Sequence, residues 1–172
     1  TGTTKVRTPA EDVIATYRAL GTKVRLAPAG KRASSAANAM LWQAGRLGLQ
    51  PLAWARPDGR PDRAEDWAST SRFLASLDLH HSMAAGWWPK VGVKYRKPAA
   101  WLPRKRIRFD LLVDHLARTI HGKPSTSTLL EACCRATGVA PGTVITAQHS
   151  LVRWEMRRLL SVLLDHPAHM TR

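Results

Sequence analysis

Apolar side chains recur along this chain at the three- and four-residue spacing of helices, and six segments combine that spacing with start or stop signals. The clearest is the first. Thr8 is placed to cap a helix starting at Pro9, Glu11 completes a capping box, and Gly21 follows as a stop. The apolar face of this helix is expected to hold Val13, Ile14, Tyr17 and Leu20.

The other five predicted helices span residues 35–47, 63–85, 109–121, 126–137 and 148–165. Asp62 and Glu65 are expected to cap the third, while Gly122 and Gly138 end the fourth and fifth. The third is expected to carry along its length Trp67, Phe73, Leu74, Leu77 and the His80–His81 pair. No strand pattern of useful length appears, so the sequence predicts an all-α bundle of about six helices.

Residues 87–108 break the helical pattern. Pro89, Gly92, Pro98 and Pro103 deny this stretch a long helix. It is expected to be an irregular connector that divides the bundle into two helical groups. A chain of 172 residues has the length of one domain, so residues 1–172 are expected to form a single helical domain.

The chain is strongly basic, with a formal net charge of +15. Arg outnumbers Lys by 19 to 8, a bias expected of a GC-rich genome, so part of this charge is compositional. The distribution is more informative than the total. No acidic residue lies between Asp12 and Asp58, or between Asp78 and Asp110. Two long basic stretches of this kind attract polyanions.

The connector offers the best local argument for a partner. Its candidate polyanion-binding residues are Lys90, Lys94, Arg96, Lys97, Arg104, Lys105, Arg106, Arg108, Trp88 and Trp101. Cations neutralise phosphates and flat rings stack on bases, as in binders of single-stranded nucleic acid. The same composition suits an anionic membrane surface. It also suits a solvated loop whose tryptophans pack inward.

Metal and catalytic signatures are missing from the sequence. The seven histidines include the His80–His81 and His166–His169 groups but no His-Glu-x-x-His spacing, and the two cysteines, Cys133 and Cys134, are adjacent. No nucleophile elbow or glycine-rich phosphate loop occurs. The sequence therefore predicts no catalytic residue, no metal site and no cofactor, and it leaves the question of an enzyme open.

A turn-rich loop from Pro51 to Trp67 is the densest local motif. Pro57, Asp58 and Gly59 have the residue types of a tight turn, and Asp62 follows shortly after. One interpretation is a loop that packs two helices together. The other is a loop that presents Asp58 and Asp62 to a ligand or cation, although two carboxylates are too few to specify a metal.

Several motifs resemble the domain-of-unknown-function 1800 family of bacterial proteins. They are Thr8-Pro9-Ala10-Glu11 leading to Arg18-Ala19-Leu20-Gly21, Trp42-Gln43-Ala44-Gly45, the loop Pro57-Asp58-Gly59-Arg60-Pro61-Asp62 with Trp67, and the closing stretch from Leu159 to His169. The resemblance implies a family loop containing Asp58, Gly59, Pro61, Asp62 and Trp67. Arg60 stands where the family commonly has an aromatic residue. No family activity can be transferred.

The resemblance also implies that the chain is the C-terminal part of a longer protein, in agreement with its start at Thr1. The leading hypothesis is a non-catalytic interaction or structural module that binds a protein, either its own N-terminal region or another subunit. The alternatives are polyanion binding through the connector and an enzyme site completed elsewhere, with Asp58, Asp62 and His80 or His81 contributing. No transmembrane segment is predicted, and a cytoplasmic or cell-envelope location fits equally well.

Overall fold

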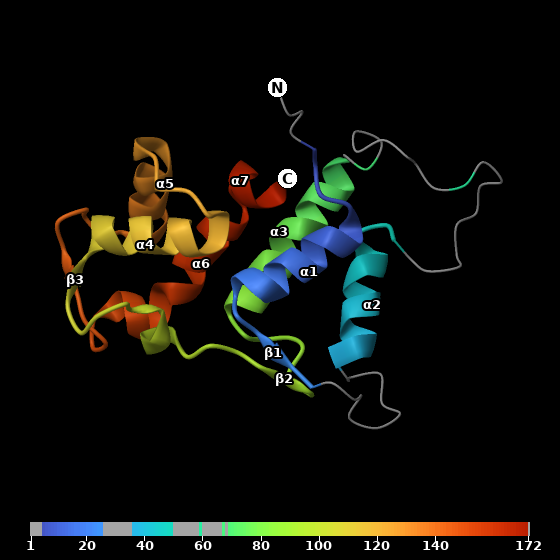
Figure 1. Ribbon diagram of the computed structural model, residues 1–172, viewed down its shortest axis with the longest axis horizontal. Coiled ribbons are helices and arrows are strands. Elements are labelled where there is room, and N and C mark those ends of the chain that lie inside the picture. Colours follow the sequence, from blue (N-terminus) through green and yellow to red (C-terminus); the bar gives the residue numbers. More distant parts are fainter. Residues whose placement is uncertain (1–4, 26–35, 50–58, 60–66, 68, 172) are drawn as a thin grey trace.

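Seven α-helices and two short antiparallel strand pairs make up the described part of the chain, residues 5–25, 36–49, 59, 67 and 69–171 of a computed structural model (Figure 1). The helices are α1 (Pro9–Ala19), α2 (Ala36–Arg46), α3 (Thr70–Ala84), α4 (Phe109–His121), α5 (Ser127–Thr137), α6 (Met156–Leu164) and α7 (Pro167–Met170). The strand pairs join β1 (Lys23–Val24) to β2 (Val93–Lys94) and β3 (Ile107–Arg108) to β4 (Val144–Ile145). The chain is therefore mostly helical.

The predicted helix ends at Thr8, Gly122 and Gly138 are confirmed. The Thr8 hydroxyl accepts from the amide of Glu11, whose carboxylate accepts from the Thr8 amide at 2.8 Å, so the capping box before α1 is complete. Gly122 and Gly138 follow α4 and α5 with φ of 69° and 68°, a left-handed conformation that glycine adopts without steric cost.

A bundle of six helices is not what the structure shows. The predicted sixth helix is divided into a π-helical segment, Leu151–Glu155, and α6, and the tail beyond it forms the additional short helix α7. The predicted start of the third helix at residue 63 is wrong, because α3 begins at Thr70 behind a Ser69 cap. The predicted caps Asp62 and Glu65 lie outside the described residues.

The connector 87–108 contains no long helix but has short regular elements. It contributes β2, a 3₁₀ helix at Pro98–Trp101, and β3. β2 pairs with β1 from the first helical group, and β3 pairs with β4 between α5 and α6. Trp101 is buried in the core. The connector therefore bonds to both helical groups, because its extended backbone finds hydrogen-bond partners in segments distant in sequence.

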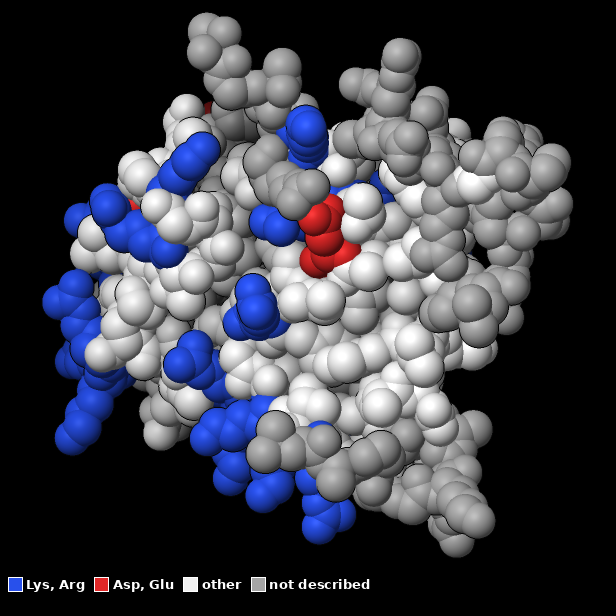
Figure 2. Space-filling model, turned by 45° about the vertical axis from the view of Figure 1, so that its right-hand side comes forward, with Lys and Arg blue, Asp and Glu red and all other residues white. Residues whose placement is uncertain are grey.

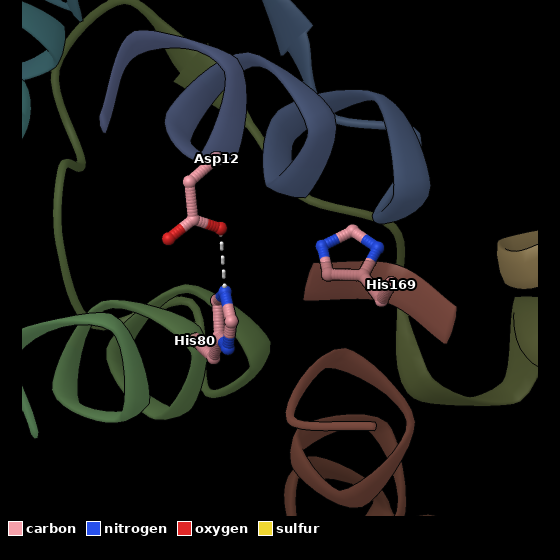
Figure 3. Close-up of side chains that lie close together, drawn as sticks. All are labelled: Asp12, His80 and His169. Carbon is pink, nitrogen blue, oxygen red and sulfur yellow. Dashed lines mark hydrogen bonds and ion pairs between the residues drawn. The ribbon is translucent and has the colours of Figure 1, made fainter. Parts of the chain in front are cut away.

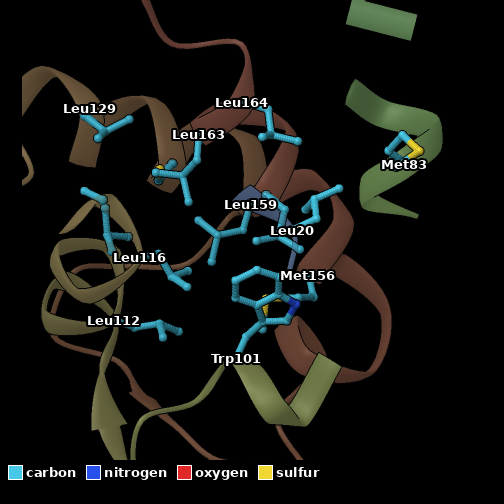
Figure 4. Packing of buried hydrophobic residues seen from close by; sticks show 14 of the residues in the cluster. Leu20, Met83, Trp101, Leu112, Leu116, Leu129, Met156, Leu159, Leu163 and Leu164 are labelled. Atoms are coloured by element: carbon cyan, nitrogen blue, oxygen red, sulfur yellow. The ribbon is translucent and has the colours of Figure 1, made fainter. Parts of the chain in front are cut away.

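One hydrophobic cluster includes residues from both helical groups (Figure 4). Leu159 and Leu163 of α6 are fully buried, as are Leu112 and Leu116 of α4, and Leu129 of α5 is nearly so. Leu20 and Met83 bring α1 and α3 into the same cluster. α6 packs against both α3 and α5 and so lies between the two groups. None of the helices in the described ranges combines the length and apolar character that a bilayer crossing needs.

The segment before α1 lies against the C-terminal helix. Val6 forms an antiparallel bridge with Thr171, and the amide of Arg7 donates to the carbonyl of Met170 at 3.0 Å. The Arg7 side chain then reaches the carbonyl of His169. These backbone contacts hold α7 beside the start of α1, which brings Asp12 and His169 close together.

Candidate functional site

The β1–β2 pair joins the two acid-free stretches of the sequence. Lys23 is in register with Lys94, and Val24 with Val93. The amide of Arg25 extends the ladder by donating to the carbonyl of Gly92 at 3.0 Å. Residues about seventy positions apart thus become direct neighbours on one two-stranded ribbon.

This pairing gathers six exposed cations, which we call the basic ribbon: Lys23, Arg25, Lys90, Lys94, Arg96 and Lys97. No acidic residue occurs in either stretch, and within the described ranges none of the six forms an ion pair. Lys and Arg side chains extend over the lower part of the face in Figure 2, the height at which β1 and β2 lie in Figure 1. Unpaired cations at this density produce a positive potential there.

The structure divides the predicted polyanion-binding residues into two sets. Lys90, Lys94, Arg96 and Lys97 belong to the basic ribbon. Arg104, Lys105 and Arg106 are exposed in the turn between the 3₁₀ helix and β3. Arg108 instead pairs with Asp110 at 2.6 Å. The predicted residues thus lie in two segments of the connector, and the β1–β2 pairing brings Lys23 and Arg25 beside the first of them.

Most tryptophan rings of the connector pack against other side chains of the protein. Trp101 is buried, with the Arg96 guanidinium 4.6 Å from its ring centroid. The half-buried Trp88 meets the edge of Trp42 at 5.3 Å between centroids. Trp87 alone of these connector tryptophans is half exposed, at 52%. Two of the three rings are thus unable to offer a free face to nucleic-acid bases.

A second feature lies inside the protein, where α1, α3 and α7 meet. Asp12 projects from α1, His80 from α3 and His169 from α7 toward one point (Figure 3). His80 Nε2 is 3.1 Å from Asp12 Oδ1, and His80 Nδ1 is 2.7 Å from Asp165 Oδ1. The Ser76 hydroxyl donates to Asp12 Oδ2 at 2.6 Å. We call these five residues the buried cluster: Asp12, Ser76, His80, Asp165 and His169.

Electrostatics in the buried cluster favour a charged His80. Burial opposes the imidazolium form, but hydrogen bonds and attraction from Asp12 and Asp165 outweigh it and raise the pKa of His80 to about 9. Burial also acts on Asp12, whose pKa is nevertheless lowered by its contacts with His80 and Ser76. A protonated His80 between two carboxylates is the stable arrangement at neutral pH.

His169 is in the opposite state. Burial first, and then the positive charge of His80, lower the pKa of His169 to about 3, so its imidazole is neutral. Its ring packs edge-on against His80 with centroids 5.5 Å apart. Among the described residues its Nε2 has no hydrogen-bond partner, although it is buried. An unsatisfied buried polar atom is uncommon and calls for an explanation.

Comparison of the sequence with models of known protein families establishes the family. Residues 1–171 match the family model described as Protein of unknown function (DUF1800). The chain belongs to this family. No curated protein and no solved structure matched it. Membership of the DUF1800 family supplies no reaction, so the functional argument rests on the basic ribbon and the buried cluster of this member.

The DUF1800 loop is only partly described here. Asp58, Pro61 and Asp62 lie outside the described residues, so their predicted role stays a prediction. Gly59 has φ of 79°, as expected of a glycine in a tight turn. Trp67 lies beside a pocket of about 500 Å³, and its carbonyl accepts from Arg72 at 2.9 Å.

The buried cluster was not predicted, although one local signal pointed to it. Asp12 stands on α1 three residues after Pro9 and four before Thr16, on the helix face that the structure buries. A carboxylate on such a face needs a buried partner. The predicted apolar face is otherwise confirmed at Val13, Tyr17 and Leu20, whereas Ile14 is exposed.

The other histidines are separate from the cluster. His81 meets Trp87 at 5.2 Å between centroids, as expected for a residue that faces away from His80. His166 stacks on His121 with ring centroids 5.1 Å apart, so the imidazole rings of His166 and His169 pack against different histidines.

Proposed function

We propose that this DUF1800 unit is a binding module whose basic ribbon attaches to an anionic lipid surface. The observation that carries the proposal is the pairing of Lys23 with Lys94, which unites two acid-free stretches on one exposed strand pair. Clustered cations near an anionic membrane contribute about 1 kcal/mol each to binding. Six such side chains are sufficient for a stable electrostatic contact.

Exposed apolar residues on the same ribbon favour lipid over nucleic acid. Val24 is 36% exposed and Val91 is 42% exposed, beside the lysines. Valine has no face on which a base can stack, but it gains free energy by entering the headgroup region of a bilayer. The burial of Trp101 removes one of the rings that recognition of single strands would use.

A protein partner is the second candidate function, and a specific observation favours it. Leu41 of α2 and Phe73 and Leu74 of α3 are each about half exposed. Large apolar side chains exposed on neighbouring helices are typical of protein contact surfaces. Because α2 and α3 pack together, these residues support the interaction module expected from the sequence. Light scattering of the chain, alone and with a proposed partner, tests this candidate.

Vesicle flotation tests the lipid proposal. The chain is mixed with vesicles of phosphatidylcholine alone, or with added phosphatidylglycerol, at two salt concentrations. We expect binding only to the anionic vesicles, weakened by salt because exposed charges are screened. Lys23→Gln/Lys94→Gln should weaken binding by roughly thirtyfold, from about 1 kcal/mol per residue.

A control variant that loses two positive charges outside the ribbon distinguishes an effect of the ribbon from an effect of net charge. Lys123 and Arg135 are exposed beside the opposite helical group, and Lys123→Gln/Arg135→Gln removes the same two charges. We expect this control to bind nearly as well as the unmodified chain. Equal losses in both variants would contradict a localised ribbon. Tight binding to single-stranded DNA without binding to anionic vesicles would show that the polyanion is a nucleic acid.

A further inference from the structure

Three potential metal ligands converge in the buried cluster. One ligand atom from each of Asp12, His80 and His169 lies within 4.8 Å of the others, and all three residues are buried (Figure 3). They come from α1, α3 and α7, so only the folded chain brings them together. Exposed acidic groups often gather without binding a metal, but two buried imidazoles with one buried carboxylate form a different donor set.

We propose that Asp12, His80 and His169 bind one divalent transition-metal ion of the zinc class. His80 would bind through Nε2 and Asp12 through Oδ1, the two atoms that now lie 3.1 Å apart. The ion would displace the proton that Nε2 shares with Asp12 in the metal-free protein, so binding releases this proton to solvent. Ligand atoms about 2.0–2.1 Å from one tetrahedral ion stand roughly 3.4 Å apart. The pair therefore needs to separate by only a few tenths of an ångström to hold the ion between them.

The cluster already contains the contacts that orient metal ligands. Asp165 lies 2.7 Å from His80 Nδ1, so that nitrogen can donate to the carboxylate while Nε2 faces the ion. This carboxylate–histidine–metal arrangement fixes the imidazole tautomer in metalloproteins. Ser76 donates to the second oxygen of Asp12, which leaves Oδ1 for the ion.

His169 provides an independent observation that points to a ligand. Its Nε2 is buried and has no hydrogen-bond partner within the described ranges. The Arg7 side chain and the Val6–Thr171 bridge hold the surrounding backbone in place. A neutral imidazole with an unused lone pair beside a carboxylate is what a zinc ligand requires. A bound ion would satisfy this nitrogen.

The chemical type of the three ligands determines which metal ions the site would bind. Two imidazole nitrogens and one carboxylate oxygen suit zinc and neighbouring transition ions, whereas calcium and magnesium prefer oxygen ligands throughout. Three protein ligands leave a fourth position on a tetrahedral ion. A pocket of about 500 Å³ is lined in part by Asp12 and Ser76, on one side of the cluster.

Zinc titration of the complete chain, residues 1–172, tests the proposal. After treatment with a chelator, calorimetry should show saturable binding of one Zn²⁺ per chain, and Zn²⁺ should raise Tm because the ion binds the folded state. Calcium should do neither. Absence of saturable Zn²⁺ binding would overturn the proposal.

The Zn²⁺ affinities of variants at the proposed ligands and at a control position show where the ion binds. His169→Gln preserves much of the side-chain volume and should lower Zn²⁺ affinity at least tenfold, and Asp165→Asn should lower it about 10–100-fold through the orientation of His80. The control is His121→Ala, because His121 belongs to the other histidine pair. Unchanged affinity in His169→Gln, or a loss only in His121→Ala, would place the ion elsewhere and contradict the assignment.

A measurement on the unmodified chain avoids any folding defect in the variants. X-ray absorption of the zinc-loaded protein should show two imidazole ligands, with the remaining scatterers being oxygen. Replacement by Co²⁺ should give the visible absorption of a four- or five-coordinate site. A zinc ion with no imidazole, or with sulfur ligands from Cys133 or Cys134, would overturn the proposed ligand set.

Discussion

The basic ribbon and the buried cluster place charge in opposite surroundings. The ribbon exposes six cations to solvent with no acid in either of the stretches that form it. The buried cluster encloses His80 between Asp12 and Asp165, and each charge there has a partner within 3.1 Å. Charges on the ribbon face solvent, whereas charges in the cluster are paired with one another inside the protein.

The difference implies separate consequences for stability and binding. Exposed charges contribute little to folding because water and salt screen them. Replacing one member of a buried charge pair strongly lowers the free energy of unfolding, because the other charge is left uncompensated in a low-dielectric interior. Substitutions in the ribbon should therefore change binding, and substitutions in the cluster should change folding. The following predictions test this separation.

Asp12→Ala should have the largest effect. It removes one carboxylate partner of His80 and the acceptor of the Ser76 hydroxyl. Breaking a buried pair costs about 3–5 kcal/mol of unfolding free energy. Urea denaturation measures the loss. The Lys23→Gln/Lys94→Gln ribbon variant should stay within about 0.5 kcal/mol of the unmodified chain. A cost of less than 1 kcal/mol for Asp12→Ala would show that the cluster is not held by charge.

The pH dependence of stability should follow His80 in chelator-treated protein. Its pKa is raised from 6.5 to about 9 in the folded state, so its contribution is complete below pH 6.5 and is lost as pH rises through 9. The shift corresponds to about 3 kcal/mol. Denaturation between pH 6 and 9.5 should show this loss in the unmodified chain and not in His80→Gln. Parallel curves for the two proteins would contradict the charged state of His80.

Acid should act on the same cluster through His169. Burial and the His80 charge lower its pKa to about 3, so the neutral ring stabilises the fold above pH 6.5. That stability decreases as pH falls from 6.5 toward 3. His169→Gln should flatten the curve between pH 6 and 4, measured by the midpoint of urea unfolding. An identical slope in both proteins would mean that other groups dominate.

Val24→Ser/Val91→Ser should produce a smaller change and distinguish lipid from other polyanions. The two side chains are only partly exposed, so the loss of apolar contact should weaken vesicle binding by roughly threefold. The effect should persist at high salt, where the electrostatic part is screened. Flotation at two salt concentrations measures it. Equal binding by both proteins at high salt would argue against insertion of the valines.

Zinc binding and vesicle binding should be independent, so the smallest change is expected when a variant in one region is tested for the function of the other. The buried cluster shares no side chain with the basic ribbon. Effects at separate sites without shared partners are usually additive. The Lys23→Gln/Lys94→Gln variant should bind Zn²⁺ within about twofold of the unmodified chain, by calorimetry. A larger change would show that the two regions are coupled.

Local signals predicted a large part of the helical structure. The capping box at Thr8 and the glycines after α4 and α5 specify helix ends within a few residues of sequence. The π-helical segment before α6 was not predicted, since it spans only five residues, about one turn, and is too short to change the apolar pattern visibly. Membership of the DUF1800 family was also predictable, because its motifs extend over the chain.

Both candidate sites depend on contacts that no local pattern reveals. Lys23 and Lys94 become neighbours only through a two-residue strand pair, which is too short to produce a visible alternation. The sequence assigned no buried face to α3, and the structure buries Arg72, Ser76 and His80 while it exposes Phe73 and Leu74. Apolar periodicity indicates the wrong face when a helix buries a polar network.

Residue-level NMR of the chain with anionic lipid tests the central claim most directly. A soluble short-chain phosphatidylglycerol is titrated into ¹⁵N-labelled protein, and amide shifts are followed for each residue. The account predicts that amides of residues 23–25 and 90–97 shift together, with one apparent affinity, because both strands form the basic ribbon. Shifts confined to residues 104–108, or spread evenly over the basic residues of the chain, would contradict it.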